Sequence, residues 1–371
     1  IERGFFMKNS CKTIDFFFFF FSENGFVSHF AQLQNPYDGR KVHILKGGPG
    51  TGKSSLMKEL AKAVQPFEEV LECIHCSSDP DSLDGIVLKQ SNLSVIDGTK
   101  PHAMEPEYAG AVENVVNLLS CVDHIALEKH REEIVKISTV ISGYHRKFCE
   151  LLKCANVMLD ANRKCILPYV DIHKMSKTAE RIAKREFKPI KETVGEEKVR
   201  MLSAFTPKGL ITYQNTIKTL CKKCWFIQDE YRVCAPVFLE LLRQKCKEAG
   251  YSCYVCHSPF KAKDEIEHLL IPQLGLAFLT VNKYEPMDQI QPSKIINTTR
   301  FINIEIFRTK KQRLHFYKKT AAEILQEAIS MLEKAKQAHD ELEQFYIPNV
   351  NFKEIGQICS QLQSDILKRY Q

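Results

Sequence analysis

The residues best suited to chemistry in this chain form one glycine-rich run near the N-terminus, which ends in a lysine and a serine. The run from Gly47 to Ser54 fits the pattern G-x-x-x-x-G-K-[ST]. Glycines let several backbone N–H groups approach one anion without Cβ clashes, and a following helix directs its positive N-terminus at the same charge. The residues expected to bind phosphate are Gly47, Gly48, Pro49, Gly50, Thr51, Gly52, Lys53, Ser54 and Ser55.

The elements on either side of this run are the ones that must position it. Residues 41–45 predict a short buried strand, and residues 54–64 predict a helix that stops before Pro66. Strand, loop and helix in this order resemble the P-loop NTPase superfamily, and the run resembles its ATP-binding branches most. The resemblance implies that Lys53 reaches the β- and γ-phosphates of ATP and that the Ser54 hydroxyl binds Mg²⁺.

Three aspartates are candidates for the rest of the site. Asp97 ends the apolar strand 93–96, where a carboxylate that holds Mg²⁺ is expected, although Asp97-Gly98 is also a common turn pair. Asp79 and Asp81 follow the strand 70–76 and are candidates for orienting water or an acceptor hydroxyl, or simply for forming a turn. No glutamate follows Asp97, so we expect either slow hydrolysis or a water-activating base elsewhere in the chain.

The next loop adds two weaker candidates. Thr99 and His102 lie just beyond Asp97 and could sense the γ-phosphate. The base-binding residues have no readable signature. An Asn-Lys-x-Asp motif, typical of GTP-binding relatives, is absent, which favours ATP.

Composition indicates an ordinary globular protein. The chain has 371 residues, of which 44% are hydrophobic and 26% charged, with a formal net charge of +7. Its longest apolar run, six phenylalanines at 16–21, is far shorter than the ~20 residues that a membrane span requires. We therefore expect a cytoplasmic protein without a membrane partner, and the length favours two domains.

The second half of the sequence repeats the first. The segment 21–27 matches 205–211, 93–97 matches 276–280, and 167–172 matches 347–352, with offsets between 180 and 184. We predict two tandem α/β domains, 13–198 and 199–371, each with a parallel sheet. Apolar residues spaced three and four apart predict a helical hairpin in each copy, at about 123–187 and 308–369, broken by Pro168 and Pro348.

The second copy has lost the phosphate-binding residues. The equivalents of Gly47, Gly50, Lys53, Ser54 and Asp97 are Asp229, Arg232, Ala235, Pro236 and Thr280. Carboxylates at this place would repel a polyphosphate. We predict one competent site, in the N-terminal half.

The whole layout resembles a family of bacterial tandem P-loop proteins described only as ATPases or ATP-binding proteins. The resemblance implies a Mg²⁺-dependent ATPase. A small-molecule kinase that uses Asp79 or Asp81 is an alternative, as is a nucleotide-gated module that binds nucleic acid or protein. The basic segment 308–319, with Phe316 and Tyr317, keeps the nucleic-acid alternative open, although a solvated helix face also explains it.

Overall fold

The computed structural model describes residues 11–33, 35–100, 103–190, 195–261 and 265–371. These residues form two compact units, each of which combines segments from both halves of the sequence. Unit 1 contains the described residues among 1–20, 28–146 and 331–371, and unit 2 contains those among 21–27 and 147–330. The predicted boundary between residues 198 and 199 falls inside β9 (Glu197–Arg200), a strand of the sheet of unit 2, and the two compact units are not divided at this point.

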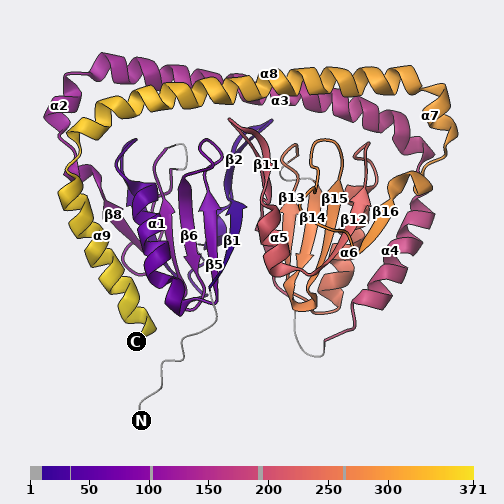
Figure 1. Ribbon diagram of the computed structural model, residues 1–371, viewed down its shortest axis with the longest axis horizontal. Helices are drawn as coiled ribbons and strands as arrows, with labels where there is room; N and C mark the ends of the chain where they lie inside the picture. Colours follow the sequence, from indigo (N-terminus) through magenta and orange to yellow (C-terminus); the bar gives the residue numbers. More distant parts are fainter. Residues whose placement is uncertain (1–10, 34, 101–102, 191–194, 262–264) are drawn as a thin grey trace, which may run out of the picture. The chain divides into compact units, whose positions relative to one another are not determined.

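Unit 1 is built on a six-stranded mixed sheet (Figure 1). Its strands, in spatial order, are β1 (Lys12–Phe17), β5 (Val70–His75), β6 (Leu83–Leu88), β7 (Leu93–Asp97), β4 (Lys41–Lys46) and β8 (Glu113–Asn117). β6 runs antiparallel to both of its neighbours, whereas the other pairs are parallel. The prediction of a parallel sheet is wrong at this strand, because the connections 76–82 and 89–92 are too short for the crossover that a parallel strand needs.

Two helices complete the core of unit 1. Helix α1 (Lys53–Val64) packs against β6, and α9 (Phe352–Leu367) packs against α1; Figure 1 shows α9 in yellow beside it. Leu60 of α1 and Leu362 and Ile366 of α9 belong to one apolar cluster. The last helix of the chain therefore stabilises the first sheet.

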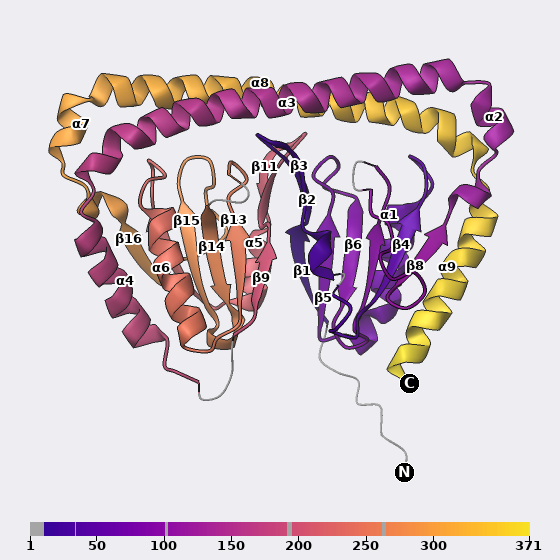
Figure 2. The same ribbon diagram turned by 180° about the vertical axis from the view of Figure 1, so that it is seen from behind.

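Unit 2 repeats this architecture (Figure 2). Its strands, in spatial order, are β16 (Lys294–Asn297), β12 (Lys223–Gln228), β15 (Leu276–Val281), β14 (Ile266–Ile271), β13 (Cys253–His257) and β9 (Glu197–Arg200). β14 is antiparallel to its neighbours, as β6 is in unit 1. Helix α6 (Ala235–Glu248) packs against β14, and α4 (Ile172–Glu186) packs against α6. The equivalent strand order agrees with the duplication read from the sequence.

Two long helices link the sheets to these outer helices. They are α3 (Arg131–Ile166) and α8 (Lys311–Tyr346), and each ends where predicted, at short turns that contain Pro168 and Pro348. The residues of α3 up to 146 belong to unit 1 and the rest to unit 2, and α8 changes unit in the opposite direction after residue 330. The predicted hairpins are wrong in this respect: α4 packs on the sheet of the second copy and α9 on that of the first.

The remaining elements are short. They are β2 (Phe19–Ser22), β3 (Gly25–Ser28), β10 (Ser203–Thr206), β11 (Gly209–Thr212), α2 (His124–Glu128), α5 (Gln214–Leu220) and α7 (Glu305–Thr309), with 3-10 turns at 30–33, 65–67, 119–121, 167–169, 272–274, 298–301, 347–349 and 368–370. The phenylalanine run 16–21 is buried. Within the described part of the chain, a helix long and apolar enough to cross a membrane is not found.

Candidate functional site

Residues 47–52, here called the glycine loop, form a tight turn between β4 and α1. Gly50 and Gly52 have positive φ angles of 67° and 80°, which glycine adopts without strain. The Thr51 hydroxyl donates to the carbonyl oxygen of Gly48 at 2.8 Å and closes the turn on itself. The turn leads directly into the N-terminus of α1 at Lys53, an arrangement suited to an anion.

Lys53 folds back over the loop that precedes it. Its Nζ donates to the carbonyl oxygens of Gly47 and Gly48, at 3.1 and 2.9 Å, and lies 3.6 Å from Oδ2 of Asp97. The other oxygen of Asp97 accepts from the backbone N–H of Thr99 at 2.8 Å. Because β7 pairs with β4, the structure brings the predicted lysine and the predicted carboxylate together.

Ser54 lies next to the start of β6. Its Oγ accepts a hydrogen bond from the backbone N–H of Leu83 at 2.9 Å. The next residue is Asp84, a buried carboxyl that the sequence analysis did not single out. An aspartate inside an otherwise apolar strand was the available signal, because charged groups are rarely buried without a specific partner.

Asp84 and Asp97 face each other across two antiparallel strands. Gly85 pairs with Ile96, which makes the two aspartates the next opposed positions. Burial, with the Asp97 charge as the next contribution, raises the pKa of Asp84 well above its ordinary value, although Cys76 and Lys53 act in the opposite direction. The site therefore contains a second carboxyl beside Asp97 and Lys53.

The other predicted residues lie around this centre. Asp79 accepts from the Ser82 hydroxyl at 3.0 Å and from the backbone N–H of Asp81 at 3.3 Å, so it organises the turn that follows β5. Asp81 and Ser55 are exposed, and Pro49 is half-buried. Thr99 accepts from the backbone N–H of Gly47 at 3.3 Å. His102 lies outside the described residues.

The terminal segment of α8, residues 331–346, lies against the glycine loop. Oε1 of Glu343 accepts from the backbone N–H of Gly50 at 3.2 Å. A Cβ atom added to Gly48 would lie 2.7 Å from the ring of Tyr346, and one added to Gly50 would lie 2.7 Å from Ile347. The glycines thus permit close approach of a helix as well as the turn itself.

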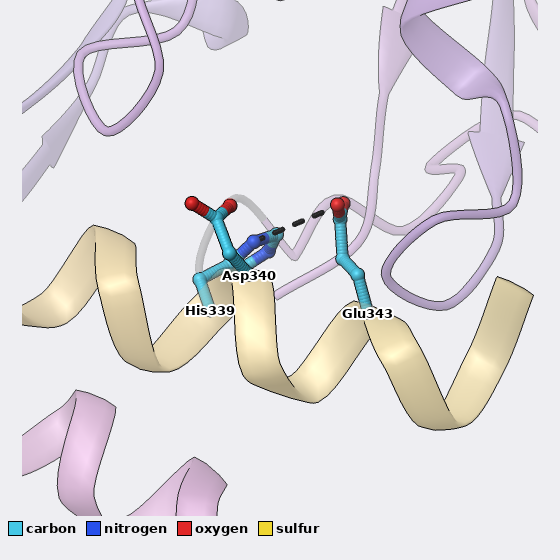
Figure 3. A group of neighbouring side chains, drawn as sticks. All are labelled: His339, Asp340 and Glu343. Carbon is cyan, nitrogen blue, oxygen red and sulfur yellow. Dashed lines mark ion pairs between the residues drawn. The ribbon is translucent and has the colours of Figure 1, made fainter.

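Two further side chains of α8 extend this contact. His339 lies 3.8 Å from Glu343, and a dashed line joins the pair in Figure 3. Burial lowers the pKa of His339. Lys336 lies 3.5 Å from Asp79 and 2.5 Å from Asp340. The sequence analysis missed these residues, because Glu343 lies 293 positions from Gly50 and no local motif relates them.

The equivalent loop of unit 2 contains a carboxylate of its own. Oδ2 of Asp229 accepts from the backbone N–H groups of Cys234 and Ala235, at 2.8 and 2.7 Å. Arg232 is buried and lies 3.2 Å from Glu267, which occupies the position in β14 that Asp84 occupies in β6. Residues of unit 2 therefore satisfy the amides of this loop, through Asp229, and pair the charge of Arg232, through Glu267.

The basic segment 308–319 spans the end of α7 and the start of α8 in unit 2. Phe316 is 58% exposed, and Lys318 lies 2.5 Å from Glu230. Leu314, on the same helix, is buried in the core of unit 2. One face of this segment thus packs against the core of unit 2, and the charged side chains lie on the other face.

Comparison with known proteins provides no relative for this chain. No protein family, no curated protein and no solved structure matches it. A functional proposal must therefore depend on the residues and distances described above.

Proposed function

We propose that unit 1 binds ATP with Mg²⁺ at the glycine loop and hydrolyses it. The observation that supports this proposal is the convergence of Lys53, Ser54 and two carboxyls, Asp97 and Asp84, beside a loop of anion-binding geometry. These groups come from α1, from the end of β7 and from the start of β6, and they meet where these two central strands of the sheet lie side by side. Phosphoryl transfer requires mainly positioning and neutralisation of charge, which such groups supply.

The loop amides and the N-terminus of α1 would hold the phosphate chain. Lys53 would exchange the carbonyl oxygens of Gly47 and Gly48 for phosphate oxygens, which are stronger acceptors because they are charged. Thr99 fixes both Gly47 and Asp97 through its hydroxyl and its backbone N–H. It therefore acts as a positioning residue for the loop and for the carboxylate.

The donor set suits magnesium. Ser54, Asp97 and Asp84 offer only oxygen atoms, the ligands that Mg²⁺ prefers, and Asp84 and Asp97 are opposed on adjacent strands. When bound, the ion would neutralise charge on the β- and γ-phosphates. Asp84 and Asp97 would orient the ion and compensate its charge in a buried environment.

Unit 2 would take no part in nucleotide binding. Its loop amides already bind Asp229, and Glu267 is already paired with Arg232. One nucleotide per chain is therefore expected. A calorimetric titration that gives two equivalents of bound nucleotide would contradict this assignment.

The test is phosphate release by the purified chain with ATP and Mg²⁺, measured with and without single-stranded nucleic acid. Lys53→Ala should lower the rate at least ~100-fold, since it removes a cation from the transferring group. Lys62→Ala is the matched control, because Lys62 is exposed on the same helix and should retain the full rate. Equal rates for the Lys53→Ala variant and the unmodified chain would reject the proposal.

A further inference from the structure

The contact between α8 and the glycine loop places an anion on one of the loop amides. Glu343 places a carboxylate oxygen on the backbone N–H of Gly50. That N–H is one of the donors that the loop would offer to a phosphate chain. A carboxylate and a phosphate cannot both occupy it, because the two anions would also repel each other at this distance.

The equivalent loop of unit 2 provides a comparison within the same chain. There the carboxylate of Asp229 bonds two loop amides from within the same loop, so no movement of a helix can remove it. In unit 1 the position equivalent to Asp229 is Gly47, which has no side chain. The carboxylate comes instead from Glu343 of α8, which lies outside the loop.

The neighbouring contacts make this segment sensitive to the charge at the loop. Lys336 ties it to Asp79 at 3.5 Å, and His339 lies 3.8 Å from Glu343. Tyr346 covers Gly48. Lys336, His339 and Tyr346 all lie within seven residues of Glu343 on α8, so loss of the Glu343 contact would loosen one continuous stretch of the helix.

We propose that Glu343 is a built-in anion that holds the glycine loop closed, and that a bound polyphosphate displaces it together with the terminal segment of α8. This inference rests on the proposed binding of nucleotide at the loop. It adds regulation: the terminal segment of α8 competes with the nucleotide for the loop, and the displacement of this segment accompanies nucleotide binding. Because only the short connection 347–351 separates α8 from α9, the position of α9 on α1 is subject to the same change.

The test compares Glu343→Gln with Glu341→Gln, an exposed residue of the same helix that has the same change of charge. Binding of ATP, ADP and inorganic triphosphate is measured by calorimetry with Mg²⁺ present. Glu343→Gln should bind each of them roughly tenfold more tightly than the unmodified chain, because a competing anion has been removed. Glu341→Gln should bind them as the unmodified chain does.

A second measurement follows the helix directly. Amide hydrogen exchange of residues 336–347 should accelerate in the unmodified chain when triphosphate is added, and should be fast in Glu343→Gln without it. Circular dichroism establishes that the variants are folded, and Glu343→Ala repeats the test if the glutamine variant is not.

The outcomes separate the two proposals. Binding that is unchanged or weaker in Glu343→Gln, in a chain that does bind triphosphate, overturns the competition and leaves the nucleotide site intact. Absence of binding in every variant overturns both.

Discussion

Gly50 and Arg232 occupy equivalent positions in the two copies of one loop, and both have left-handed backbone conformations, with φ angles of 67° and 55°. An arginine adopts such a conformation at a cost of roughly 1 kcal/mol or more. The side chain compensates, because its guanidinium lies 2.6 Å from Ser258 and 3.2 Å from Glu267 in a buried environment. The second loop has therefore kept the left-handed backbone of the first at this position, and its side chain forms an ion pair inside unit 2.

Loss of this guanidinium should destabilise unit 2. Arg232→Met leaves the buried Glu267 carboxylate without its partner and should lower the free energy of unfolding by about 3–5 kcal/mol. Denaturant titration of the variant measures the loss. The double variant Arg232→Met, Glu267→Gln should recover at least half of it, and nucleotide binding should be unchanged in both. A loss below about 1 kcal/mol would show that the pair is not important for stability.

Asp84 should contribute to the affinity of the site for a metal ion. Asp84→Asn removes one of the carboxyls opposed across β6 and β7, so the affinity for Mn²⁺ with nucleotide should fall roughly tenfold or more. Paramagnetic resonance of Mn²⁺ reports this without any turnover. Asp123→Asn is the control, because Asp123 is exposed and caps α2, where asparagine serves equally well, so the metal affinity should stay within about twofold. The same Mn²⁺ affinity in both variants would exclude Asp84 from the ligand set.

Acid should destabilise the protein before its carboxylates are protonated. Burial, with the nearby Arg369 charge as the next cause, lowers the pKa of His43 from 6.5 to about 4. Below pH 6.5 the unfolded chain takes up a proton that the folded chain refuses until about pH 4, so stability is full above 6.5 and is lost between these values. The loss should be about 1–3 kcal/mol after allowance for partial exposure of the ring.

Denaturant titrations at pH 7.0, 5.5 and 4.5 measure this slope. His43→Asn should flatten it but not abolish it, because burial also lowers the pKa of His145 on α3 to about 4. A variant profile that coincides with that of the unmodified chain would show that His43 does not contribute.

Helix α9 should be a stability element of unit 1 and not of unit 2. Ile366 is 1% exposed and belongs to the apolar cluster of unit 1, so Ile366→Ala should lower the stability of that unit by about 2–5 kcal/mol. Hydrogen exchange resolves the two units, and protection should fall in β4 and α1 while it is retained in β12 and α6. Gln357→Ala, at an exposed position of α9, should change neither. Equal losses in both units would contradict this division.

The local part of the site was predictable from the sequence. The strand at 41–45 and the helix from 54 to 64 are confirmed as β4 and α1, because glycine spacing, an apolar run and Pro66 are local signals. The breaks at Pro168 and Pro348 are confirmed for the same reason, since proline removes a backbone donor wherever it stands.

The long-range part was not predictable. Periodicity shows that α9 has an apolar face, but it does not say which sheet that face covers. The antiparallel direction of β6 was readable in principle from the seven residues of the connection 76–82, which cannot form a crossover. Glu343 had no local signal, because a single acidic residue on a long helix is common.

Helix α4 follows the first copy in sequence but packs in the core of the second, and α9 follows the second copy but packs in the core of the first. This arrangement also affects the order in which the two cores can be completed during translation. Domains usually fold as they leave the ribosome, the N-terminal one first. Here the nascent sheet that begins at β1 lacks Leu362 and Ile366 until the last helix has been synthesised. The glycine loop is thus made well before the helix that completes the core of its unit.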